Sequence, residues 1–129
     1  MSDSAFGLST IGQILVPVSD VERSTAFYRD GLGLRFLFGY PGFAFFDADG
    51  VRLMLEVIER PEFAGRLTVY FRVPDIEAAV AALEPRGVAF PHRAHIVHRD
   101  PAYDLWMAFT TDPDGNNIGL MEERATTAG

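Results

Sequence analysis

Two residue types are missing from this chain of 129 residues, which has neither cysteine nor lysine. The lack of cysteine excludes disulfides, thiol nucleophiles, thiolate zinc sites and iron–sulfur clusters. The lack of lysine excludes Schiff-base chemistry and the lysine of a phosphate-binding P-loop. Because nothing in the sequence calls for an oxidising compartment, we expect a cytoplasmic protein.

Long apolar runs and an excess of positive charge are also missing. No run approaches the roughly 18 apolar residues that a membrane-spanning helix needs, and residues 1–9 lack the basic and then apolar pattern of a secretory signal. The net charge is −7, from 11 arginines and 18 acidic residues, and it would repel a phosphate backbone. We therefore expect neither a membrane nor a nucleic acid as a partner.

The rest of the composition is that of an ordinary globular protein, with 48% hydrophobic and 22% charged residues. A chain of this length forms one domain with a sizeable core. It also contains an internal repeat. The apolar segment Ile11–Val18 is followed by Asp20 and a helical stretch, and Leu67–Val73 is followed by Asp75 and a second helical stretch. Each aspartate stands where a helix N-cap is expected.

The elements after each aspartate follow the same order in both halves. The apolar spacing predicts helices from Val21 to about Asp30 and from Ile76 to just before Pro85. Strands are expected at residues 35–40, 43–47, 51–58, 88–90, 105–111 and 117–122. Each half thus has the order β-α-β-β-β, with modules at about residues 10–60 and 66–123. The predicted class is α+β, with the two modules packed together in one domain, residues 1–129.

Alternation along the expected strands separates two faces of each sheet. One face is uniformly apolar and suits contact with the helices. The opposite face mixes apolar residues with Gln13, Arg52, Glu56, Thr68 and Tyr70. Such a mixed face is typical of a concave ligand cleft, or else of a sheet face in contact with solvent. Periodicity alone does not separate these two interpretations.

Four segments in this order resemble the motifs of the vicinal oxygen chelate superfamily, namely Ile14–Asp20, Ala26–Leu34, Phe71–Asp75 and Thr111–Ile118. That superfamily includes glyoxalase I, bleomycin-resistance proteins, extradiol dioxygenases, methylmalonyl-CoA epimerase and fosfomycin-resistance enzymes. The resemblance implies two βαβββ modules whose sheets curl into a cup. In the enzymes, a divalent metal ion is bound there by up to four ligands.

The resemblance places the four metal-ligand positions on Gln13, Glu56, Thr68 and Gly119. Glycine has no side chain and threonine is a poor ligand for Fe, Ni, Zn or Mn, so two of the four positions cannot bind in the family's manner. We therefore expect no metal cofactor. The alternative is a divalent metal held by Gln13 and Glu56 together with an unforeseen ligand such as Glu122 or His95.

Three histidines, His92, His95 and His98, stand three residues apart. In a regular strand His92 and His98 share one face and His95 lies on the other, so the three would not converge on one metal ion. His95 alone could reach the cup as a proton donor or a ligand contact. A histidine in a surface loop is the other interpretation.

Aromatic residues make up 12% of the chain. Most belong to the core, but alternation places several on the mixed face, which would suit a flat or hydrophobic small molecule. The residues expected to contact such a ligand are Gln13, Arg52, Thr68, Tyr70, His95 and Trp106. Glu56 is the candidate general base, with Arg52 as its expected partner on the same face.

These observations predict a protein that binds a small organic molecule in the cup without the full metal site. It would sequester the molecule or catalyse metal-free proton transfer with Glu56 as base. The alternative is a metal-dependent glyoxalase, epimerase or dioxygenase. The resemblance further implies a homodimer, with modules paired either within one chain or between chains.

Overall fold

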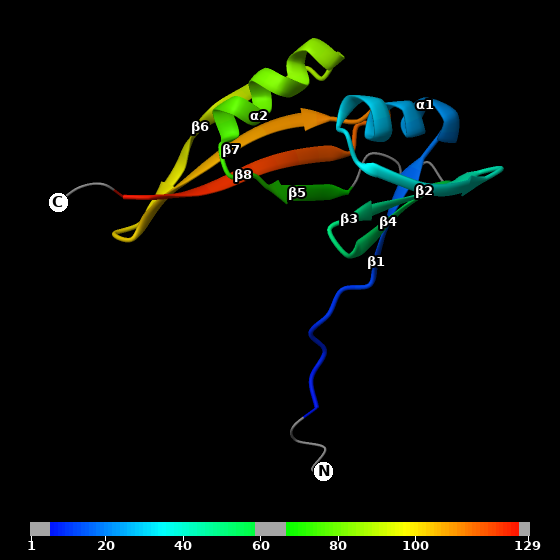
Figure 1. Cartoon of the computed structure of the whole chain (residues 1–129), viewed down its shortest axis with the longest axis horizontal. Helices are drawn as coiled ribbons and strands as arrows, with labels where there is room; N and C mark the ends of the chain where they lie inside the picture. Colours follow the sequence, from blue (N-terminus) through cyan, green and yellow to red (C-terminus); the bar gives the residue numbers. More distant parts are fainter. Residues whose placement is uncertain (1–5, 59–66, 127–129) are drawn as a thin grey trace.

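The computed structural model describes residues 6–58 and 67–126, which form two similar units (Figure 1). The first unit contains β1 (Gln13–Val18), α1 (Val21–Ala26), a π-helical turn (Phe27–Gly31), β2 (Arg35–Tyr40), β3 (Phe43–Ala48) and β4 (Val51–Val57). The second contains β5 (Thr68–Arg72), α2 (Ile76–Leu83), a 3-10 turn (Glu84–Arg86), β6 (His92–Arg99), β7 (Tyr103–Thr111) and β8 (Asn117–Ala125).

The two units have the same sheet topology. The strand order is β1-β4-β3-β2 in the first four-stranded sheet and β5-β8-β7-β6 in the second. The pairs β1–β4 and β5–β8 are parallel, and the remaining pairs are antiparallel. The predicted β-α-β-β-β order and the α+β class are therefore confirmed.

The helices begin where the sequence predicts. The Asp20 carboxylate accepts hydrogen bonds from the backbone N–H groups of Glu22 and Arg23, both at 3.1 Å. The Asp75 carboxylate accepts one from the Ala78 N–H at 3.1 Å. These contacts satisfy N–H groups that have no partner within the first turn of a helix. At the other end, Gly87 has a φ of 90° and ends the 3-10 turn that follows α2.

Both helices lie on the same side of the two sheets in Figure 1, and the N-terminal segment leads away from the opposite side. Each helix therefore covers one face of its own sheet and leaves the other face open. None of the helices in the described residues is long and apolar enough to cross a membrane.

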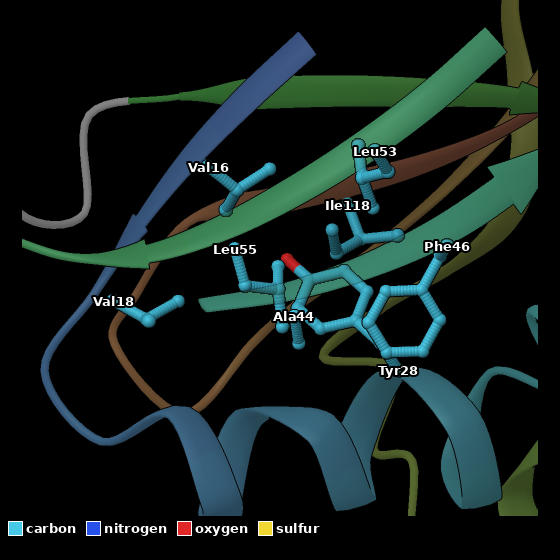
Figure 2. Packing of buried hydrophobic residues seen from close by; sticks show 8 residues of the cluster. All are labelled: Val16, Val18, Tyr28, Ala44, Phe46, Leu53, Leu55 and Ile118. Atoms are coloured by element: carbon cyan, nitrogen blue, oxygen red, sulfur yellow. The ribbon is translucent and has the colours of Figure 1, made fainter. Parts of the chain in front are cut away.

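The covered faces hold the hydrophobic core. Tyr28, Phe46, Leu53 and Leu55 are fully buried between α1 and the first sheet. Ile118, from β8 of the second unit, packs into the same cluster (Figure 2). The core is therefore continuous between the two units.

A buried network of polar groups also joins the units, and we call it the inter-module network. It consists of Tyr28 together with Asp112, Asp114 and Asn116 from the turn between β7 and β8. The Tyr28 hydroxyl donates to the Asp112 carboxylate at 2.8 Å, and the Asn116 side-chain amide donates to the Pro17 carbonyl at 3.0 Å. The sequence predicts a hairpin turn here, but it does not reveal these contacts with the first unit.

One predicted strand was wrong. Residues 88–90 form no strand, although Val88 and Phe90 are only 2% and 6% exposed. Their apolar alternation reflects burial beneath α2 rather than pairing in a sheet. The strand in that place is β6, which lies at the sheet edge and carries three histidines and two arginines. Charged residues are common on edge strands, where they discourage pairing with other chains.

Candidate functional site

Each sheet has one open face, and its side chains form rows that cross the strands. On the first sheet, one row contains Leu15, Met54, Phe45 and Phe38, and the neighbouring row contains Gln13, Arg52 and Asp47. On the second sheet, one row contains Tyr70, Gly119, Phe109 and His92, and the neighbouring row contains Thr68, Asn117 and Thr111. We call these surfaces the first and the second open face. Each open face therefore has a largely apolar row beside a polar one.

The first open face holds an arginine against two aromatic rings. The Arg52 guanidinium carbon lies 5.8 Å from the centroid of the Phe38 ring and 5.7 Å from that of Phe45. These two ring centroids are 4.7 Å apart. Contacts of this kind are favourable cation–π interactions, and they hold the guanidinium in place. The Gln13 side-chain nitrogen lies 3.8 Å from the Met54 sulfur.

The second open face is built around a glycine. A methyl group placed on Gly119 would lie 2.6 Å and 2.9 Å from two carbons of the Tyr70 ring. The Tyr70 ring therefore occupies the space that a side chain at position 119 would need. It also meets the Phe109 ring edge to face, with the centroids 6.0 Å apart. In the neighbouring row, the Asn117 amide donates to the Thr68 hydroxyl at 3.4 Å.

The structure does not bring Gln13 and Glu56 together. Gln13 is paired with Arg52, whereas Glu56 is paired with Pro17, four positions further along. That offset corresponds to about 13 Å along the strand. Because side chains stand roughly perpendicular to a sheet, the two do not converge on one ion.

The matching ladders of the two sheets identify the position that corresponds to Gly119. Gln13 pairs with Arg52 in the first sheet, and Thr68 pairs with Asn117 at the same place in the second sheet. Two residues further along β4 and β8 stand Met54 and Gly119. The first-sheet counterpart of Gly119 is therefore Met54 and not Glu56. The placement of the implied fourth-strand ligand on Glu56 is corrected accordingly.

The residues at these positions do not fit the family's metal site. Gln13, Met54, Thr68 and Gly119 supply one amide, one thioether, one hydroxyl and no fourth donor, a poor set for Fe, Ni, Zn or Mn. The described residues also contain no group of three or more His, Asp or Glu side chains that could hold a metal ion. This donor set therefore supports no reaction step through a metal ion.

Glu56 and Arg52 share the first open face, but they have different neighbours. Glu56 is half-buried and lies between Pro17 and Phe43 on the neighbouring strands. Arg52 contacts the two phenylalanine rings described above. The expected ion pair between Glu56 and Arg52 is not found in the described part of the chain, because four strand positions separate the two residues.

All three histidines face the second open face, contrary to the expectation from regular alternation. The ladder between β6 and β7 is irregular between His92 and His95 and again between Ile96 and His98, with one extra β6 residue at each place. Each extra residue reverses the alternation, so His95 joins the other two. Their partners on β7 are Phe109, Met107 and Leu105. The His95 Nδ1 atom lies 2.7 Å from the Arg93 carbonyl oxygen.

Trp106 and Glu122 lie on the covered face of the second sheet, where they pair with each other across β7 and β8. Trp106 packs against the core beneath α2, and the Arg124 guanidinium lies 4.4 Å from its ring centroid. Trp106 is therefore removed from the predicted ligand contacts. The Glu122 carboxylate accepts the Ile76 N–H at 2.9 Å and ion-pairs with Arg124, whose hydrogen bonds lower the Glu122 pKa. It supports α2 and is not directed to the open face.

A cleft of about 450 Å³ also opens at the junction of the two sheets. Its walls include Ile14, Leu53, Val69 and Phe71. These side chains pack with the core on the covered faces. Asp47 of the first open face and Tyr70 of the second also line it, so the cleft adjoins both open faces.

The chain matches the model of the glyoxalase/bleomycin resistance protein/dioxygenase superfamily over residues 10–120. The fold and this match show that the chain belongs to that superfamily. No curated protein of known function matches the chain in sequence.

Two similar solved structures come from Streptomyces sp. CB03234. The antibiotic binding protein TnmS3 is 29% identical, with a TM-score of 0.72, over 92% of this chain and 98% of that one. A glyoxalase/bleomycin resistance protein is 30% identical, with a TM-score of 0.66, over 86% of this chain and 98% of that one. A lactoylglutathione lyase from Agrobacterium tumefaciens is 22% identical, with a TM-score of 0.71, over 90% of this chain and 95% of that one, and shows the shared fold alone.

Proposed function

We propose that this protein binds and sequesters a small aromatic or hydrophobic molecule on its open faces, without a metal ion. The observation that carries the proposal is the replacement of chelating groups by Met54 and by Gly119, over which the Tyr70 ring lies. Both positions favour apolar contact over coordination. The similarity to an antibiotic binding protein supports a binding role.

The side chains of the first open face also support this ligand class. Phe38 and Phe45 offer ring surfaces for stacking, and Arg52 offers a positioned cation for an acidic or carbonyl group. Gln13 and Thr68 supply hydrogen-bonding groups at the edge of the apolar rows. An apolar surface with a few polar groups is the usual composition of a small-molecule site.

A catalytic form of the proposal uses Glu56 as general base in metal-free proton transfer. Its half-buried position beside Phe43 supports contact with a bound molecule. The variant Glu56→Gln separates the two forms, because it keeps the shape and removes the base. Unchanged ligand affinity with no conversion of the ligand by either protein supports sequestration, whereas turnover that is lost in Glu56→Gln supports catalysis.

The binding test uses anthracene-9-carboxylate as a fluorescent probe and compares two aromatic variants. Phe38 and Phe36 are 39% and 38% exposed, but Phe38 lies on the open face and Phe36 packs against Phe46 of the core. We expect Phe38→Ala to weaken probe binding about two- to tenfold, through loss of a ring contact, and Phe36→Ala to leave the affinity unchanged. Equal effects of the two variants, or no binding by the wild type, would contradict the proposal.

Metal content separates the proposal from the metal-dependent alternative. The untagged protein is offered Mn, Fe, Co, Ni and Zn in turn, desalted, and measured by mass spectrometry. We expect retention well below one ion per chain. Near-stoichiometric retention would instead support a metal-dependent glyoxalase, epimerase or dioxygenase.

We also propose that the protein is cytoplasmic and forms a homodimer. The open faces of the two copies would jointly enclose the ligand. Several large apolar side chains outside the core are exposed, including Phe6, Leu8 and Ile11 of the N-terminal segment. Contact with a second copy would remove this apolar surface from water. Light scattering during size-exclusion chromatography is expected to give twice the mass of the chain, and a monomer mass at all concentrations would overturn this part.

A further inference from the structure

We propose that the Tyr70 ring, seated on the bare backbone of Gly119, is a stacking platform that makes the protein selective for flat, fused-ring aromatic molecules. Gly119 is then a specificity-determining residue, although it offers no group to the ligand. This inference rests on the proposed function and deepens it, because it names the shape of the ligand and the residue that selects it.

The close contact explains why position 119 has no side chain. A methyl group there would lie 2.6 Å and 2.9 Å from Tyr70 ring carbons and 3.1 Å from a carbon of Phe109. Carbon atoms that are not bonded pack at about 3.5–4.0 Å. Even alanine would therefore force the Tyr70 ring to move.

Backbone conformation does not require glycine at this position. Gly33, Gly42, Gly50, Gly87 and Gly115 have positive φ values, which favour glycine, but Gly119 does not. It lies within the regular ladder of β8, opposite Phe109 and Tyr70. What glycine supplies at position 119 is the space for a ring.

The position of the ring suits stacking with a flat molecule. Tyr70 is supported by the Gly119 backbone and by the edge-to-face contact with Phe109, yet it remains 50% exposed. A ring that is held in place loses little conformational freedom when a ligand stacks on it. In the neighbouring row, Thr68 and Asn117 can hydrogen-bond polar substituents at the edge of the ligand.

The first open face has no ring at the positions that correspond to Tyr70 and Gly119. Their counterparts are Leu15 and Met54, and the unbranched thioether of Met54 fits curved as well as flat surfaces. Phe38 and Phe45 offer ring surfaces on the first open face, but neither is seated on a glycine, so we assign the selection by Gly119 to the second open face.

The experiment compares two carboxylates of different shape. Anthracene-9-carboxylate is flat and aromatic, whereas adamantane-1-carboxylate is globular and aliphatic, and both carry one negative charge. Affinities are measured by calorimetry for the wild type, Gly119→Ala, Tyr70→Leu and the double variant. We expect Gly119→Ala to weaken anthracene-9-carboxylate about three- to tenfold, the range of an aromatic contact, with little effect on adamantane-1-carboxylate.

The double variant isolates the contact between the two residues. If Gly119 acts by seating the Tyr70 ring, Gly119→Ala adds no further loss once Tyr70→Leu has removed that ring. Gly12→Ala is the matched control, because no atom lies within 4 Å of the added methyl group. Tyr70→Leu leaves the backbone unchanged and tests the platform even if Gly119→Ala fails to fold.

Each outcome has one meaning. If the wild type binds anthracene-9-carboxylate and both Gly119→Ala and Tyr70→Leu keep the wild-type affinity, the platform is overturned and the proposed function stands. A wild type that binds neither carboxylate overturns both. A nuclear Overhauser contact between the Tyr70 ring protons and the Gly119 α-protons provides a readout without ligand, and its absence also overturns the platform.

Discussion

The inter-module network gives the sharpest stability prediction, through the variant Tyr28→Phe. The buried Tyr28 hydroxyl donates to the Asp112 carboxylate at 2.8 Å. The same carboxylate accepts from the Asn116 side-chain amide at 2.8 Å and from the backbone N–H groups of Asn116 and Asp114 at 2.9 Å. Phenylalanine keeps the packing of the ring and removes one of these four hydrogen bonds. A hydrogen bond to a charged group contributes about 1.5–3 kcal/mol, which is the expected loss in the free energy of unfolding.

Urea denaturation followed by circular dichroism measures this loss, and a melting temperature lowered by about 5–12 °C should accompany it. Tyr40→Phe is the control, because Tyr40 is 62% exposed, and its hydroxyl loss should cost less than about 0.5 kcal/mol. Equal stabilities of Tyr28→Phe and the wild type would refute the assigned role of the network.

The pH dependence of the same pair is a second test of the reasoning. Burial, and then the Asp112 charge, raise the Tyr28 pKa in the folded protein above its ordinary value of 10.0. The stability that Tyr28 contributes is therefore fully present below pH 10 and is lost as the pH rises above that value. The stability difference between the wild type and Tyr28→Phe should narrow in alkali, and a difference that widens would contradict this account.

Three further predictions concern single residues. Asp75→Ala removes the hydrogen bond to the Ala78 N–H and should cost about 1 kcal/mol in urea denaturation, and no loss would argue against the cap. The Glu122 pKa is held below its ordinary 4.5 chiefly by hydrogen bonds from Arg124, so Glu122 stabilises the fold above that pH, and the contribution is lost in acid. The stability of Glu122→Gln should therefore fall less steeply in acid than that of the wild type. Leu55→Ala leaves a cavity in the core and should cost about 2–5 kcal/mol, and a smaller loss would mean that the core collapses around it.

The features that depend on local chemistry could be predicted from the sequence. Asp20 and Asp75 cap their helices as expected, because an N-cap uses only the residue and the turn that follows it. The repeat of an apolar strand, a capping aspartate and a helix then indicates the modular order. The family resemblance drawn from four short motifs was confirmed by the match to the superfamily model over residues 10–120.

The features that depend on strand register could not be predicted. His95 joins His92 and His98 on one face because β6 carries two extra residues relative to β7, and nothing in its own sequence marks their places. Residues 88–90 alternate like a strand, yet they are buried outside either sheet. Burial and strand pairing produce the same short apolar pattern, so three residues do not distinguish them.

Gly119 in the candidate site shows the same limit of prediction from sequence. In the sequence, Gly119 indicates only that a chelating group is missing, and its contact with Tyr70, 49 positions away, depends on the parallel pairing of β5 with β8. The same kind of pairing between β1 and β4 separates Gln13 from Glu56. In both cases the residue itself could be read from the sequence, but its pairing partner on the neighbouring strand could not.

The covered face and the open face of each sheet have separate roles. The covered faces and the inter-module network hold the two units together, and they take no side chains from the rows of the open faces. A change on an open face, such as a thioether at Met54 or a ring seated on Gly119, therefore leaves the core packing intact. Distant positions without shared partners contribute additively to stability. The fold can thus lose the chelating groups of its superfamily and present an aromatic surface in their place.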